Sequence, residues 1–194
     1  MTMDFNSFYE LLRGDRSVRR FDASREISGD TLRQLVELTR YCASGRNAQP
    51  LRYRIVHDEA ERNAVFPHLA WAGYYQDWAG PSEEERPSAY LIQCLDTAFG
   101  KDCLCDDGLQ LQSITLGART LGISGCIIKA FNAKGVADAL SIDERYAPRY
   151  VLALGYPKEN VRIVDMEADG DFKYYRDADD TQCVPKRPLS ALLI

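Results

Sequence analysis

Apolar residues recur at helical spacing in the first part of the chain. Residues 5–13 repeat them every three to four positions, and Gly14 can end a helix there. Ser28 is a suitable N-cap for a second helix that runs toward Gly45. Residues 59–69 could form a third, shorter helix. The first third of the chain therefore predicts mainly helical structure.

Four apolar runs have the composition of core strands. They cover residues 53–57, 89–95, 123–128 and 150–154, and the last is followed by Gly-Tyr-Pro at 155–157. A strong helix is predicted between the second and third runs. Its apolar face consists of Leu111, Ile114, Ala118 and Leu121.

A further short helix is expected after the third strand, where Asn132 is a suitable N-cap. Strands that alternate with helices are typical of α/β and α+β folds. A chain of 194 residues fits one domain, which we place at residues 1–194.

Two segments depart from this alternation. Residues 71–87 combine tryptophan and tyrosine with glycine, proline and an acidic run, which suggests a lid or a contact with a partner. Residues 158–194 are acidic at first, then basic, and end in an apolar stretch. Because this arm has no evident core in which to bury its apolar end, we expect it to wrap over a neighbouring subunit.

The overall charge argues against two classes of partner. The net charge is -5 and the isoelectric point is near 5.1, which disfavours nucleic acid and anionic membranes. No apolar run approaches the roughly 20 residues that span a bilayer. The first residues resemble no signal peptide, so we expect the protein in the cytoplasm.

The six cysteines and two histidines do not form a recognisable site. In a reducing compartment the cysteines are expected to be free thiols. The two histidines, His57 and His68, do not complete a set of metal ligands, so no metal site is expected.

Basic residues gather at two places that lie far apart in the sequence. Arg16, Ser17 and Arg19 combine guanidinium groups with a hydroxyl, which are suitable phosphate ligands. Lys186 and Arg187 form a second cluster near the C-terminus. The two clusters could hold one phosphate together, or each could be a solvated part of the surface.

Two further segments could contact the rest of a ligand. Ser44 and Asn47 lie in a polar stretch, 43–50, that suits the edge of a heteroaromatic ring, although it could equally be a helix end with a turn. Residues 122–130 could form a strand that leads into a loop with backbone amides facing a ligand.

Several common catalytic fingerprints are missing from the sequence. It contains neither a G-x-G-x-x-G dinucleotide motif nor a P-loop, and no motif pairs a serine or cysteine nucleophile with a histidine. No catalytic side chain is therefore predicted. This is typical of an enzyme whose chemistry resides in a cofactor.

Taken in order, these segments resemble the nitroreductase family of flavoproteins. The resemblance rests on R-S-x-R-x-F at 16–21, S-x-x-N-x-Q-P at 44–50, a helix that begins D-x-G at 106–108, the Gly-Tyr-Pro strand end, and the Lys-Arg-Pro-Leu tail. Three positions depart from the usual family pattern. Asp15 replaces a basic residue, Ala43 replaces proline, and Leu51 replaces tryptophan.

The resemblance implies an α+β fold, a three-layer sandwich whose mostly antiparallel central sheet is flanked by helices. It also implies a homodimer with FMN at the subunit interface and the arm 158–194 wrapped around the partner. Its implied FMN contacts fall into three groups. They are Arg16, Ser17 and Arg19 with Lys186 or Arg187 at the phosphate, Ser44 and Asn47 from the partner subunit, and Ile128, Lys129 and Ala130 near flavin N5.

The implied reaction takes hydride from NADH or NADPH and passes it through the flavin to a nitroaromatic, a quinone or a similar acceptor. Arg187 and Arg46 are candidates for the group that stabilises the reduced flavin. An alternative is a protein that stores or remodels FMN without NAD(P)H turnover. A second alternative is an acidic interaction module whose arm docks a partner.

Overall fold

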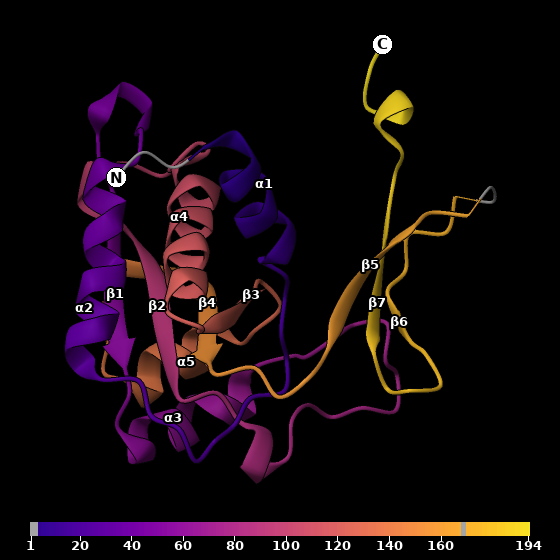
Figure 1. The fold of residues 1–194 in the computed structure, drawn as a ribbon. Helices are drawn as coiled ribbons and strands as arrows, with labels where there is room; N and C mark the ends of the chain where they lie inside the picture. Colours follow the sequence, from indigo (N-terminus) through magenta and orange to yellow (C-terminus); the bar gives the residue numbers. More distant parts are fainter. Residues whose placement is uncertain (1–3, 168–169) are drawn as a thin grey trace.

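The computed structural model describes residues 4–167 and 170–194. Met1–Met3, at the start of the segment compared with signal peptides, and Asp169, in the acidic part of the arm, lie outside the described residues. Five α-helices follow the chain in the order shown in Figure 1: α1 (Phe5–Gly14), α2 (Gly29–Glu37), α3 (Glu59–Val65), α4 (Asp106–Thr120) and α5 (Ala133–Ala139). None of the described helices is long and apolar enough to cross a membrane.

The central sheet has four strands in the order β1-β2-β4-β3, and all its neighbours are antiparallel. Its strands are β1 (Leu51–Val56), β2 (Ala89–Asp96), β3 (Ser124–Ile128) and β4 (Tyr146–Gly155). The prediction of a mostly antiparallel sheet is confirmed. Strand β4 begins earlier than its apolar run because the register shifts between Gln93 and Cys94, and the strand continues through Pro148.

Helices cover both faces of this sheet. Alternate residues of β2 point to opposite sides, so that Leu91 packs with α2 and α4 while Ile92 packs with α3 and α5. Figure 1 shows α2 and α4 side by side on one face. The molecule is therefore the three-layer α+β sandwich that the resemblance implied.

The predicted polar residues cap the N-termini of two helices. Ser28 accepts a hydrogen bond from the backbone N–H of Thr31, and Asn132 accepts one from Gly135. Helix α2 ends at Glu37, well before Gly45, because the chain tightens into a 3-10 turn over Leu38–Tyr41.

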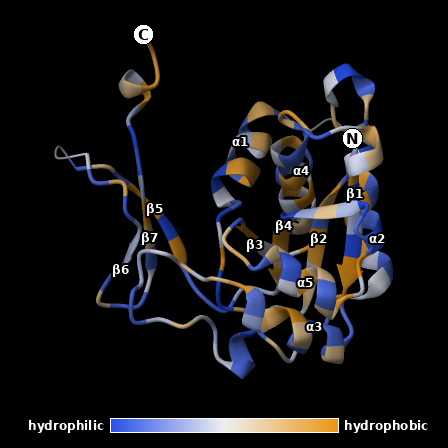
Figure 2. Ribbon diagram, turned by 180° about the vertical axis from the view of Figure 1, so that it is seen from behind, coloured by the Kyte–Doolittle hydropathy of each residue, from blue (hydrophilic) through white to orange (hydrophobic). Residues whose placement is uncertain are grey.

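The C-terminal arm contains a second sheet that the sequence analysis missed. Its strands are β5 (Val161–Asp165), β6 (Tyr175–Arg176) and β7 (Gln182–Lys186). β5 pairs with β7 in parallel, and β6 pairs with β7 in antiparallel fashion. The arm projects away from the sandwich (Figure 1), and Figure 2 shows apolar positions, in orange, on the central strands and again at the C-terminal end. That end is uncovered, since Leu192 and Leu193 are 65% and 68% exposed.

Candidate functional site

The segment 15–18 forms one wall of the candidate site by running alongside β3. The backbone N–H of Val18 donates to the carbonyl of Gly125 at 3.0 Å, and Ser17 lies opposite Gly125 in a parallel bridge. A side chain at Gly125 would come within 3.0 Å of the Ala153 carbonyl, so glycine permits the close approach. Ser17 faces a small hollow that is also lined by Ile127.

Arg16 lies near enough to Lys186 for their charges to interact, although 170 positions separate the two residues in the sequence. Lys186 is exposed at the surface, but partial desolvation lowers its pKa, and the positive charge of Arg16 lowers it further. Arg16 Nη2 donates to the Leu12 carbonyl at 3.0 Å. Its Nε is buried and has no hydrogen-bond partner among residues 4–167 and 170–194.

Two adjacent cations and an orphaned donor are the features expected of an anion site. A buried N–H without an acceptor is costly, and neighbouring positive charges repel each other. A phosphate group would accept from the free donor and neutralise both charges. Arg16 and Ser17 line the same hollow, and Lys186 lies close enough to Arg16 for their charges to interact. Arg187 follows at the next position, is exposed, and makes no ion pair within the described chain.

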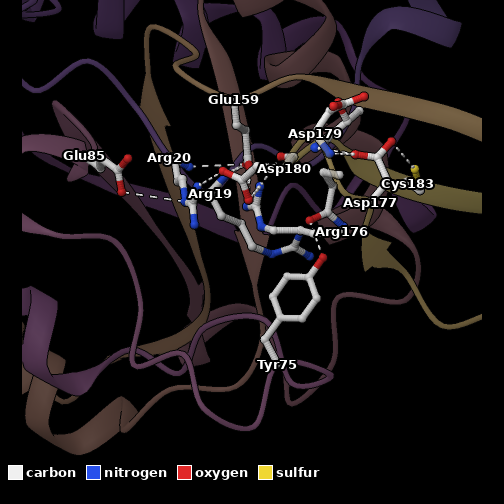
Figure 3. Close-up of polar contacts among 12 residues, drawn as sticks. Arg19, Arg20, Tyr75, Glu85, Glu159, Arg176, Asp177, Asp179, Asp180 and Cys183 are labelled. Carbon is white, nitrogen blue, oxygen red and sulfur yellow. Dashed lines mark hydrogen bonds and ion pairs between the residues drawn. The ribbon is translucent and has the colours of Figure 1, made fainter.

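Arg19 does not join these residues. Its guanidinium lies 4.6 Å from the ring centroid of Tyr174 in the arm, and its backbone N–H donates to Glu159 (Figure 3). Its side chain therefore packs against the arm.

Asp15, the acidic departure from the family pattern, is held by two residues of α4. Gln112 Nε2 and Thr115 Oγ1 each donate to its carboxylate at 2.6 Å. These bonds direct the carboxylate toward α4 and hold the C-terminal end of α1 against α4. Gln112 and Thr115 also line the small hollow. Gln112 belongs to the helix motif that begins at Asp106, but the sequence analysis gave it no role, and Thr115 lies outside any motif.

Ser44 and Asn47 lie near the N-terminal end of α4. Ser44 Oγ donates to Asp106 at 2.6 Å and accepts from the backbone N–H of Gln49 at 2.9 Å. Asn47 is exposed and has a φ of 54°, while Arg46 and Gln49 have φ of 55° and 47°. Three left-handed residues so close together cost energy, which makes this loop a candidate for function. Within the described chain, Ser44 and Asn47 contact neither Arg16 nor Lys186.

The predicted flavin loop at 128–130 follows β3. Ile128 is buried in the cluster beneath α5, whereas Ile127 is 41% exposed and lines the hollow. Alternation along a strand would have identified Ile127 as the outward residue. Lys129 Nζ donates to the Arg149 carbonyl at 3.2 Å, and the Ala130 carbonyl accepts from Ala70.

A larger groove of about 760 Å³ lies on the other side of Arg16, between α1, the end of α4 and residues 157–163. Basic side chains outnumber acidic ones along it. The basic ones are Arg13, Arg16, Arg119, Lys158 and Arg162, and the acidic ones are Glu10 and Glu159. The surroundings of Arg16 are thus positive in a chain whose net charge is -5.

None of the cysteines forms a disulfide bond. All six are unpaired, and burial raises the pKa of the Cys126 thiol. In the part of the chain that the structure describes, no group of three His, Cys, Asp or Glu side chains is placed to hold a metal ion.

Comparison with known proteins agrees with this fold. The sequence profile of the nitroreductase family matches residues 12–91. YdgI of Bacillus subtilis (strain 168), which carries the name of an NAD(P)H nitroreductase, is 24% identical over 184 residues, covering 77% of this chain and 88% of the relative. The chain is thus similar in sequence to the nitroreductase family.

Solved structures share the nitroreductase fold at low identity. A nitroreductase family protein from Clostridium difficile 630 has a TM-score of 0.67 at 18% identity, covering 99% of this chain and 98% of that chain. A protein from Exiguobacterium sibiricum 255-15, described as a nitroreductase in complex with FMN, has a TM-score of 0.65 at 21% identity, covering 82% of this chain and 90% of that chain. The first match includes the arm as well as the sandwich of this chain.

Proposed function

We propose that this protein is a cytoplasmic, FMN-dependent oxidoreductase of the nitroreductase kind that takes hydride from NADH or NADPH and reduces a nitroaromatic, a quinone or a similar acceptor. The observation that carries the proposal is the hollow lined by Arg16 and Ser17 together with the nearby positive charge of Lys186. A second support is the buried Arg16 Nε, which lacks an acceptor in the described chain. The name of YdgI and the FMN complex of the Exiguobacterium protein point to the same cofactor chemistry.

The chain's own residues would bind and orient FMN. Arg16, Ser17 and Lys186 would hold its phosphate, with Arg187 within reach of the same group. Ile127 offers an apolar surface to the ring, and the loop of Ile128, Lys129 and Ala130 would lie along the ring's reactive edge. FMN, when bound, supplies a ring that accepts a hydride and passes its electrons on.

A homodimer would complete the site. Helix α1 has no buried residue, and exposed apolar side chains also line the beginning of α4 and the end of the arm. These side chains are Phe5, Phe8, Tyr9, Leu104, Leu109, Leu192 and Leu193. Such a surface needs a partner, and two-fold symmetry would bring Ser44 and Asn47 of one subunit to the phosphate-bound FMN of the other.

Colour is the first test of this function. The purified protein, or the protein reconstituted with FMN, should show a flavin spectrum that is bleached by anaerobic NADH or NADPH. A protein that binds FMN but stays oxidised with both donors would support the storage alternative. A colourless protein that cannot be reconstituted would favour the acidic interaction module.

A further inference from the structure

Glu159 lies where the chain leaves the central sheet and enters the arm. Its side chain is 2% exposed. One carboxylate oxygen accepts from the backbone N–H groups of both Arg19 and Arg20, the latter at 3.3 Å (Figure 3). Next to it, the backbone N–H of Lys158 donates to the Arg20 carbonyl at 2.9 Å. Glu159 thus fastens the base of the arm to the segment that continues from the proposed phosphate site.

The second oxygen of Glu159 faces the arm. It accepts a hydrogen bond from Arg176 Nη2, and the Arg176 side chain is only 16% exposed. Arg176 belongs to β6 and pairs with Gln182, the first residue of β7. One buried carboxylate therefore joins the N-terminal segment to β6, which pairs with β7, the strand that ends at Lys186.

Weaker contacts surround this pair. Arg20 lies 2.5 Å from Asp180 and 3.7 Å from Glu85. From the aromatic segment 71–87, Tyr75 donates to Gln182 Oε1 at 2.7 Å, and its ring centroid lies 5.3 Å from that of Tyr174. The segment considered as a lid is thus packed against the arm, where it reinforces the same connection.

The register of the arm transmits this anchoring to the phosphate site. β5 and β7 pair from Val161 opposite Gln182 to Asp165 opposite Lys186. Arg16 lies three positions before Arg19, which is fastened to Glu159. Displacement of the Glu159–Arg176 pair would therefore shift Lys186 relative to Arg16, although neither Glu159 nor Arg176 belongs to the proposed phosphate ligands.

We propose that Glu159, through Arg176, is a positioning residue that holds the strand carrying Lys186 beside Arg16 and so sets the selectivity of the site for a phosphorylated flavin. This role rests on the proposed FMN function. Breaking one partner of a buried ion pair leaves an uncompensated charge, which the surrounding strands relieve by moving. The phosphate contact should be lost first, because it depends on both ends of the chain.

The test compares the dissociation constants of FMN and riboflavin, which differ only in the phosphate. For Glu159→Gln and Arg176→Met, the ratio of riboflavin to FMN dissociation constants should fall about tenfold or more, the size expected for one lost charge-assisted hydrogen bond. Asp180→Asn is the matched control. Its side chain contacts the same arginines but is 61% exposed, so the ratio should stay within about twofold of wild type. Tyr75→Phe is a milder variant that keeps the ion pair and should lower the ratio in the same direction by less.

A purely structural role predicts a different result. General loosening would weaken FMN and riboflavin binding equally and lower the melting temperature with the ratio unchanged, which would overturn the proposal. Should Glu159→Gln fail to fold, Arg176→Met and Tyr75→Phe test the same connection from the arm side. The wild-type ratio tests the proposed function separately. Equal affinity of the wild type for both flavins would refute the phosphate site itself, and the role of Glu159 with it.

Discussion

Ser44 donates a 2.6 Å hydrogen bond to the buried carboxylate of Asp106, so the loop proposed to reach the partner's flavin also secures the first turn of α4. The backbone N–H of Gly45 donates to the other oxygen of the same carboxylate at 2.9 Å. The loop 44–49 is thereby held in shape before any ligand binds, which reduces the ordering that binding would require.

Replacement of Ser44 by alanine should accordingly cost stability. The Asp106 carboxylate would lose one of its donors while still buried, which costs about 1–3 kcal/mol of unfolding free energy. Urea denaturation of the apoprotein measures the effect. Asn47→Asp is the matched control, because Asn47 is exposed, its Oδ1 accepts from Gln49 alone within the described chain, and aspartate tolerates the φ of 54° as asparagine does. It should leave the unfolding free energy within about 0.5 kcal/mol of wild type and weaken FMN binding. An equal loss of stability in both variants would contradict this division of roles.

Loss of both Arg16 and Lys186 should abolish tight FMN binding. Hydrogen bonds to charged groups contribute about 1.5–3 kcal/mol each, so Arg16→Met with Lys186→Met should raise the FMN dissociation constant by about two decades or more. Fluorescence titration with FMN gives the constant, and Arg13→Met, which changes a basic residue of the larger groove, is the control. FMN affinity preserved in the double variant would remove these residues from the site.

The pH dependence should report on Lys186 specifically. Its pKa in the folded apoprotein is lowered, first by partial desolvation and then by Arg16. The folded chain therefore loses this proton at lower pH than the unfolded chain does, and the penalty of holding the charge disappears as pH rises between the two pKa values. Lys186→Met should remove this penalty and make the apoprotein slightly more stable at neutral pH.

FMN should reverse this preference, because a phosphate favours the charged ammonium. FMN affinity should decline at alkaline pH as Lys186 loses its proton, and calorimetry in buffers of different ionisation enthalpy should detect proton uptake on binding. Lys186→Met should abolish the uptake. If the variant takes up as many protons as the wild type, the titrating group lies elsewhere.

Turnover should not require Cys126. Its side chain is 5% exposed, and burial raises the pKa of the thiol, so the reactive thiolate is disfavoured. Cys126→Ser should bind FMN and oxidise NAD(P)H like the wild type, with some loss of thermal stability from a hydroxyl in an apolar cluster. A folded variant that binds FMN but cannot be reduced would reveal a redox thiol.

The sandwich could be predicted from the sequence because its elements carry their own signals. Leu111, Ile114 and Ala118 repeat at helical spacing, and Ser28 and Asn132 cap helices locally, so no distant contact was needed to identify these elements. The outward position of Ile127 could also have been inferred, since strand alternation follows directly from the burial of Cys126 and Ile128.

The arm could not be predicted in the same way. β6 has two residues, and its place depends on Arg176 meeting Glu159, 17 positions away in sequence, so no periodic pattern marks it. The orientation of the Arg19 side chain could not be predicted from the sequence either. The motif suggested a phosphate ligand, whereas Tyr174, 155 positions later, turns its guanidinium toward the arm. Contacts between residues far apart in sequence decide such cases, and they leave no local pattern.

Two truncations separate the roles of the arm. Removal of 188–194 takes away Leu189, Leu192 and the other exposed apolar residues but keeps β7 and Lys186. If these apolar residues bury a partner surface of the obligate class, roughly 2,000–5,000 Å² in total, the shorter chain should become monomeric in light scattering. It should keep the positions of Arg16 and Lys186 in each subunit but lose the partner's Ser44 and Asn47, so FMN should bind weakly.

Removal of 185–194 should have a larger effect, because it also deletes Pro185 and Lys186 from β7. This chain should be monomeric and should no longer distinguish FMN from riboflavin, whereas the 188–194 truncation should still do so. Dimerisation should therefore be lost in both truncations, and discrimination between FMN and riboflavin only in the longer one. A chain that lacks 188–194 yet remains dimeric and yellow would show that the apolar end of the arm does not join the subunits, and that Ser44 and Asn47 serve the partner through some other contact.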